Sequence, residues 1–217
     1  LMCAGEGGGR IIAPTNLYGA SVDALGDFLP QFGIHADFVK DINDLHEIES
    51  LIGPATRAIF AETVANPNTA ITDIRPLADL AHRHGLALIL DNTVPTPYLL
   101  RPIEFGADIV VHSTTKGITG HGNAIGGVIV DGGNYNWANG KFPQIDGPSE
   151  GYHGLNLHEA FGPAAFIVKC RVDGLRDLGC CPSPFDSYLM MIGLETLSLR
   201  VKHQVESTWK LAEYCRS

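Results

Sequence analysis

The sequence lacks the features of membrane-spanning, secreted and nucleic-acid-binding proteins. No apolar run approaches the roughly 18 residues that a membrane-spanning helix needs, and the chain does not open with a basic segment followed by an apolar stretch. Basic residues are few, with 15 Lys and Arg against 24 Asp and Glu, and they form no stripe that could follow phosphates. We therefore expect a cytoplasmic protein with neither a membrane nor a nucleic-acid partner.

Cysteine is also scarce. The five cysteines are odd in number and irregularly spaced, which fits neither a disulfide framework nor a CxxC zinc site. We expect reduced thiols that are mostly packing residues, namely Cys3, Cys170, Cys180, Cys181 and Cys215. The histidines show no HExxH or comparable ligand spacing, so we expect no metal site.

What is present is the pattern of an α/β protein. With 217 residues, of which 45% are hydrophobic, the chain can bury a sizeable core. Short apolar runs alternate with helical patterns between residues 11 and 130, which is typical of βαβ units in a mostly parallel sheet. The expected strands begin at Ile11, Ala36, Arg57, Leu86, Asp108 and Ala124.

The helical patterns predict where the sheet is covered. Asp41 is expected to cap a helix that runs to Leu51, and Asp73 a helix that stops at Gly85. Residues 134–154 lack periodicity and predict a long loop, whereas residues 157–178 and 184–213 have apolar residues at helical spacing. We expect the last helix to leave the sheet domain.

Polar residues follow three of the expected strands. The strand LALIL is followed by Asp91 and Thr93. The strand DIVVH is followed by Ser113, Thr115 and Lys116, and the strand RAIF is followed by Glu62 and Asn66. Ligands of open α/β sheets bind at the carboxyl ends of the strands, so these residues are candidates for a site.

These side chains suit pyridoxal 5′-phosphate (PLP). A PLP site needs a lysine amine to form an imine, a carboxylate against the pyridinium nitrogen, and hydroxyls for the phosphate. Lys116 could supply the amine, Asp91 the carboxylate, and Ser113 and Thr115 the hydroxyls. Tyr18, after the first strand, could stack on a cofactor face.

Each of these residues also has an ordinary structural explanation. A lysine in a Gly-rich loop is usually a solvated surface charge, and an Asp at a strand end often forms a turn or caps a helix. Ser113 and Thr115 could satisfy nearby backbone groups, and Tyr18 could be a packing aromatic. A nucleotide-binding Rossmann fold is a further alternative, but no glycine fingerprint follows the first strand.

A family resemblance joins these separate signals. The segments LYG, AETVANPNT, LILDNTVPTPYLLRPIEFGADIVVHSTTKGITGHGNAIGGVIVD and SPFDSYLMMIGLETLSLR together resemble the Cys/Met-metabolism PLP enzymes. Within that family, the insert containing Trp137, Gly140–Gln144 and Gly151–Gly154 is similar to that of the O-acetylhomoserine sulfhydrylases. Cystathionine synthases and lyases usually lack this insert and are the alternative.

The resemblance implies a fold and a division of the chain. It implies the aspartate-aminotransferase-like fold (fold type I) of PLP-dependent transferases, with a mostly parallel, seven-stranded-type sheet flanked by helices. Residues 1–183 would be the PLP-binding large domain without its N-terminal part, and residues 184–217 a long linker helix leading toward an absent C-terminal domain. The chain would therefore be truncated.

The resemblance also implies roles for individual residues. Lys116 would hold PLP covalently and move protons, Asp91 would pair with the pyridinium nitrogen, and Tyr18 would stack on the ring. The other expected contacts are Asn66 with the ring hydroxyl, Ser113 and Thr115 with the phosphate, and Glu62 and Thr93 as supporting residues. Lys116 and Tyr18 are thus the expected catalytic residues.

The implied reaction is a γ-replacement in methionine biosynthesis. O-acetylhomoserine and sulfide, or a thiol, would give homocysteine, or methionine, and acetate, in a homo-oligomer (a dimer or a tetramer). The family's phosphate-binding turn and Tyr-x-Arg would lie before Leu1, and its carboxylate-binding arginine after Ser217. We therefore expect weak or no catalysis from these residues alone, and a non-catalytic remnant is an alternative. The sequence also departs from the residues that are usual in the family at Ala20-Ser21, Thr114 and Gly117.

Overall fold

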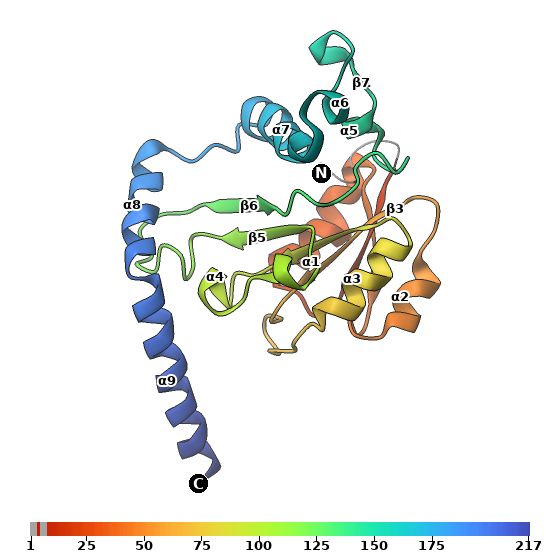
Figure 1. Cartoon of the computed structure of the whole chain (residues 1–217). Coiled ribbons are helices and arrows are strands. Elements are labelled where there is room, and N and C mark those ends of the chain that lie inside the picture. Colours follow the sequence, from red (N-terminus) through yellow and green to blue (C-terminus); the bar gives the residue numbers. More distant parts are fainter. Residues whose placement is uncertain (1–3, 5–7) are drawn as a thin grey trace.

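A six-stranded sheet forms the centre of the protein (Figure 1). The computed structural model describes Ala4 and residues 8–217, and the strand order is β2-β1-β3-β4-β5-β6. The first five strands are parallel to their neighbours and β6 is antiparallel to β5. The strands are β1 Arg10–Pro14, β2 His35–Val39, β3 Thr56–Glu62, β4 Ala87–Asp91, β5 Ile109–Ser113 and β6 Gly127–Asp131.

The α/β prediction and all six expected strands are confirmed. In the described part of the chain the sheet has six strands, whereas the resemblance implied a seven-stranded type. The central strands are nearly continuous apolar runs because helices cover both of their faces. In β4, Leu88 and Leu90 face one layer, and Ala87 and Ile89 face the other. This alternation sets which residues at the strand's end turn toward a ligand.

Short helices connect the strands and a long helical segment ends the chain. The α-helices are α1 Gly19–Asp23, α2 Leu45–Leu51, α3 Ile74–Arg83, α4 Thr96–Leu99, α5 Pro143–Asp146, α6 Leu157–Phe161, α7 Ala165–Lys169, α8 Pro184–Glu195 and α9 Leu197–Arg216. Other helical turns and strands are η1 Ala24–Phe28, η2 Leu29–Phe32, η3 Pro102–Phe105, β7 Pro148–Ser149, η4 Glu150–Tyr152, β8 Leu155–Asn156, η5 Gly162–Ala164 and η6 Cys170–Asp177.

The predicted helix starts need one correction. Helix α2 begins at Leu45, and its cap is Asp44, not Asp41. The Asp44 carboxylate accepts the backbone N–H groups of His46 and Glu47, which satisfies donors that the first helical turn leaves free. Asp73 does occupy the cap position of α3, although its side chain makes no cap hydrogen bond.

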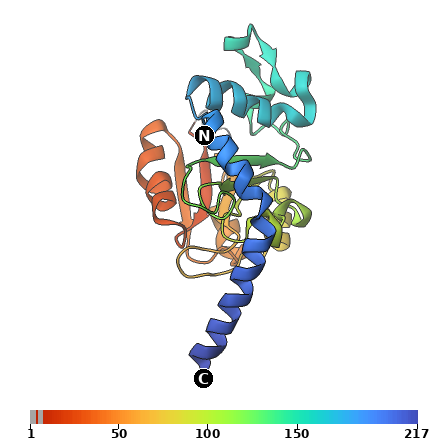
Figure 2. The ribbon, with the colours of Figure 1, turned by 90° about the vertical axis from the view of Figure 1, so that its left-hand side faces the viewer.

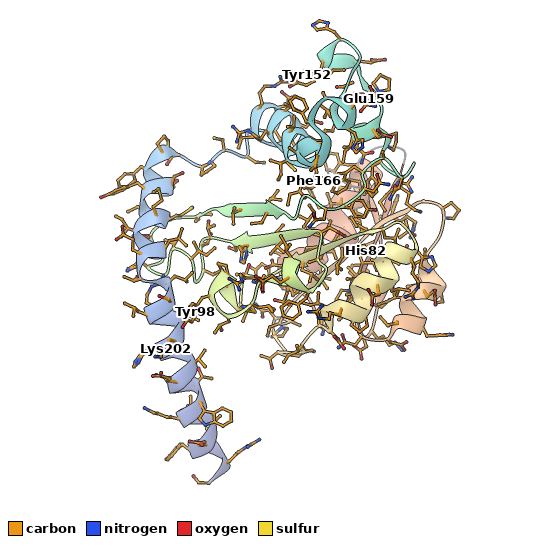
Figure 3. All side chains as sticks on the ribbon, viewed as in Figure 1. His82, Tyr98, Tyr152, Glu159, Phe166 and Lys202 are labelled. Atoms are coloured by element: carbon orange, nitrogen blue, oxygen red, sulfur yellow. The ribbon has the colours of Figure 1, made fainter. Side chains whose placement is uncertain are left out.

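Two layers cover the sheet. Helices α2 and α3 pack on one face, and the segment from Trp137 to Phe166 packs on the other. The rings of Trp137 and Phe166 are stacked with centroids 4.7 Å apart, and Phe166 is labelled in Figure 3. The expected loop at residues 134–154 is therefore more ordered than predicted, because Trp137 and Phe142 are fully buried and α5 and β7 form within it.

The last two helices form a nearly continuous rod along one side of the domain (Figure 2). They are separated at Thr196, and α9 extends away from the sheet with only Leu197 and Val201 buried. The helical prediction for residues 184–213 is thus confirmed as two helices. Among the described residues, no helix is both long and apolar enough to cross a membrane.

The exposure of the described cysteines differs from the prediction that they are mostly packing residues. Cys180, Cys181 and Cys215 are exposed and only Cys170 is partly buried, so the expectation of mostly packing residues is wrong for the described thiols. Cys3 lies outside the described residues.

Candidate active site

A cavity of about 770 Å³ opens at the carboxyl ends of β3, β4 and β5. All eight residues named from the sequence border it, namely Tyr18, Glu62, Asn66, Asp91, Thr93, Ser113, Thr115 and Lys116. Parallel strands end at one edge of a sheet, which is why residues far apart in the chain meet here. The volume lies within the range of about 300–1,000 Å³ that is common for small-molecule sites.

Glu62 ties two cavity segments together. This carboxylate ends β3 and is only 6% exposed. One oxygen accepts the backbone N–H of Tyr18 at 2.7 Å, and the other accepts that of Asn66 at 2.8 Å. Burial raises the pKa of Glu62, and the two N–H donors oppose this. Glu62 therefore positions Tyr18, a residue that is 51% exposed and borders the cavity.

Asp91 and Ser113 are linked through Thr93. The Thr93 backbone N–H donates to Asp91 Oδ1 at 2.8 Å, which forms a local turn after β4. The Thr93 hydroxyl oxygen accepts the backbone N–H of Ser113, also at 2.8 Å. One residue thus links the Asp91 carboxylate to the backbone of Ser113 on the neighbouring strand.

Lys116 lies on a tight turn after β5. Its backbone N–H donates to Ser113 O at 3.2 Å, and Gly120 N–H donates to Lys116 O at 2.8 Å. The hydroxyl of Thr115 accepts the backbone N–H of Gly126 at 3.0 Å. The side chain of Lys116 is exposed and borders the cavity, so its amine can reach a bound molecule.

Two departures from the family pattern have local structural explanations. Thr114 is buried, and its hydroxyl donates to Met190 Sδ at 3.2 Å. A Cβ atom at Gly117 would lie 2.7 Å from Thr96 Cγ2, closer than van der Waals contact allows. A larger residue at position 117 would therefore displace Thr96, which is 3% exposed and cannot easily give way.

The sequence reasoning missed Arg200 and Gln204. Both come from α9, which the sequence predicted to leave the sheet domain, yet its first turns border the cavity. Arg200 falls in the segment SPFDSYLMMIGLETLSLR that carried part of the resemblance. That segment was the available signal, although it did not show where Arg200 lies.

The described donors fit the needs of a PLP site. A lysine amine, a carboxylate, hydroxyl groups and a half-exposed aromatic ring surround one cavity. A model of the family described as Cys/Met metabolism PLP-dependent enzymes matches residues 1–217. The chain belongs to this family. The resemblance seen in the sequence is thereby confirmed.

Relatives within the Cys/Met metabolism family bear sulfhydrylase names. A sulfhydrylase of Fusarium oxysporum f. sp. lycopersici is 46% identical over 215 residues, covering 98% of this chain and 49% of that protein. An O-acetyl-L-homoserine sulfhydrylase of Thermus thermophilus is 45% identical over 210 residues, covering 96% of this chain and 50% of that protein. The chain thus spans about half the length of these relatives.

A solved structure has a closely similar fold. An O-acetylhomoserine (thiol)-lyase from Campylobacter jejuni superposes with a TM-score of 0.92 at 35% identity, covering 97% of this chain and 52% of that protein. That structure carries a pyridoxyl-lysine monophosphate. The predicted fold class is confirmed by this match together with the mostly parallel sheet.

Proposed function

We propose that the cavity binds PLP and that Lys116 holds it covalently through its amine. The observation that carries the proposal is the convergence of all eight predicted side chains on one cavity of about 770 Å³. The membership of the chain in a PLP-dependent family supports the choice of cofactor.

Each cavity residue has a proposed task. The Asp91 carboxylate pairs with the pyridinium nitrogen and keeps it protonated, and the exposed ring of Tyr18 stacks on the cofactor ring. Asn66 donates to the ring hydroxyl. The hydroxyl of Ser113 donates to the phosphate, and the hydroxyl of Thr115 does so in place of its hydrogen bond to Gly126 O. Glu62 holds Tyr18 and Asn66 in place, and Thr93 holds Ser113.

The proposed reaction of the whole protein is a γ-replacement on O-acetylhomoserine. Bound PLP supplies an electron sink for negative charge that forms on the substrate. The released amine of Lys116 moves protons at Cα and Cβ, acetate leaves from Cγ, and sulfide or a thiol adds there to give homocysteine or methionine. The sulfhydrylase names of relatives at 45–46% identity support this reaction.

A cystathionine synthase or lyase activity is the second candidate. A cystathionine gamma-lyase from Lactobacillus plantarum superposes with a TM-score of 0.75 at 30% identity, covering 97% of this chain and 47% of that protein. Its TM-score and identity are lower than those of the O-acetylhomoserine (thiol)-lyase described above, which favours the sulfhydrylase reaction.

The reaction is tested by supplying O-acetylhomoserine with sulfide and measuring homocysteine and acetate. Equal amounts of the two products, lost in Lys116→Ala, are expected of a sulfhydrylase. Release of a keto acid from cystathionine would favour the lyase. PLP binding without any turnover would indicate that these residues alone act as the non-catalytic remnant considered above.

The assembly, the compartment and the domain division are further parts of the proposal. We propose a homo-oligomer, because apolar side chains on β6 and α8, including Ile129 and Met191, are exposed. Light scattering of the purified protein tests this. Free thiols at the described cysteines favour the cytoplasm. We also propose that residues 1–183 form the PLP-binding domain and that residues 184–217 link it to another domain, since α9 leaves the body of the protein.

A further inference from the structure

Arg200 joins helix α9 to the loop that carries Lys116. Its Nη1 donates to Gly117 O at 2.9 Å, and its Nη2 donates to Ile118 O at 3.3 Å. The same guanidinium donates to Gly193 O at 2.7 Å and to Thr196 Oγ1 at 3.0 Å. Four hydrogen bonds therefore connect the first two residues after Lys116 to the junction between α8 and α9.

The backbone at this junction is closely packed. A Cβ atom at Gly120 would lie 2.1 Å from Arg200 Nη1, and Gly120 also has a φ of +72°, which glycine tolerates best. A Cβ atom at Gly193 would lie 2.2 Å from Thr119 O. Glycines on both sides thus allow the guanidinium and the α8–α9 junction to contact the lysine loop directly. Near this junction α9 also contacts α4, on the side of the molecule where Tyr98 and Lys202 are labelled in Figure 3.

The bonding of Arg200 fits a positioning role better than a role in general charge pairing. A guanidinium has five N–H donors in a rigid fork, and four of them are engaged by the oxygen atoms above. Three of these acceptors are backbone carbonyls of the loop and the junction. Among the described residues, no carboxylate forms an ion pair with Arg200.

We propose that Arg200 is a positioning residue that fixes the loop of Lys116 against the α8–α9 junction. The proposal rests on the proposed function only in that Lys116 is taken as the PLP-bearing residue. Arg200 acts through Gly117 and Ile118, and its rigid fork makes contacts that a lysine cannot reproduce.

Hydrogen exchange of the cofactor-free chain tests the loop contact without any PLP chemistry. The amides to follow are those of Thr119 and Gly120, which donate to Thr114 O and Lys116 O. In Arg200→Gln their exchange is expected to be about tenfold faster, and in Arg200→Lys the acceleration is smaller. Arg101→Gln is the matched control, because its guanidinium is exposed and pairs with Glu104 on the surface.

The amides of the central strand β4 report on the fold of each variant. Unchanged exchange at Thr119 and Gly120 in Arg200→Gln overturns the proposal. So does faster exchange that is equally large in β4, since the effect would then be global and not confined to the loop.

The rate of covalent PLP attachment tests the effect on Lys116. It is measured by borohydride reduction at timed intervals and peptide mass analysis. Attachment is expected to slow about tenfold or more in Arg200→Gln, to recover partly in Arg200→Lys, and to be unchanged in Arg101→Gln. Equal rates in all four proteins overturn the positioning role. If wild type itself forms no adduct, the proposed function fails, while the hydrogen-exchange result still decides whether Arg200 holds the loop.

Discussion

Replacing Thr93 with valine removes one hydrogen-bond acceptor between two strands of the site. Valine has nearly the shape of threonine, so packing is kept while the hydroxyl is lost. The backbone N–H of Ser113, which donates to Thr93 Oγ1 at 2.8 Å, then has no acceptor at that position. The bond from Thr93 N–H to Asp91 is unaffected, because it uses the backbone. The change therefore tests the link to Ser113 alone.

The expected magnitude follows from the partial burial of this bond. A typical hydrogen bond contributes about 1 kcal/mol, and a buried donor without a partner costs about 1–3 kcal/mol. Because Thr93 and Ser113 are only partly buried, water can reach the freed N–H group in part. We expect a loss of about 1–1.5 kcal/mol in the free energy of unfolding, which lowers the Tm by roughly 2–6 °C for a domain of this size.

The same change should weaken PLP binding, since Ser113 is a proposed phosphate ligand. A loss of about 1.4 kcal/mol in binding corresponds to a tenfold higher Kd. Thermal unfolding followed by circular dichroism and PLP titration followed by absorbance measure the two effects. Thr93→Ser keeps the hydroxyl and should bind PLP almost normally.

Thr208→Val is the matched control, because Thr208 is exposed on α9 and its hydroxyl donates to Gln204 O of the same helix. If Thr93→Val matches this control in both stability and PLP affinity, the reasoning about Thr93 is refuted.

Three further predictions concern packing, pH and thiol reactivity. Gly117→Ala should destabilise the protein by about 1–3 kcal/mol through its contact with Thr96 Cγ2, and adding Thr96→Ser should restore most of the loss in denaturant unfolding. A hydrogen bond to Asp108 raises the pKa of His82 above its ordinary 6.5. The stability that this pair contributes is therefore present below pH 6.5 and is lost as the pH rises through the higher pKa of the folded state. The free energy of unfolding, measured across this pH range, should fall in wild type and not in His82→Gln. Burial raises the pKa of Cys170 to about 11, so timed alkylation with peptide mapping should label it after the exposed thiols, and equal rates would contradict this. Those exposed thiols are Cys180, Cys181 and Cys215.

The strand-end residues were predictable because of how parallel sheets are built. Glu62 and Asp91 end adjacent strands in direct register, so two polar residues after two apolar runs had to meet at one edge. The same reasoning located Ser113 and Lys116 after the next strand. The meeting of these side chains at one cavity could therefore be predicted from the positions at which apolar runs end, whereas their assignment to PLP came from the family resemblance.

Other features depend on contacts that local patterns do not encode. Arg200 reaches the lysine loop because the junction between α8 and α9 lies against it, and nothing in the periodicity of those helices specifies that contact. Asp41 and Asp44 are both suitable caps, and only the backbone geometry decides that Asp44 caps α2. Trp137 and Phe142 lie in a segment without periodicity, so their burial against the sheet was not visible from spacing.

The central claim is that Lys116 carries PLP in the cavity formed by β3, β4 and β5. Its most direct test is to incubate the purified chain with PLP, reduce it with borohydride and map the modified peptide by mass spectrometry. The account predicts a pyridoxyl group on Lys116, with no such adduct in a folded Lys116→Ala variant. An adduct on a different lysine, or none in the folded wild-type chain, would contradict the account.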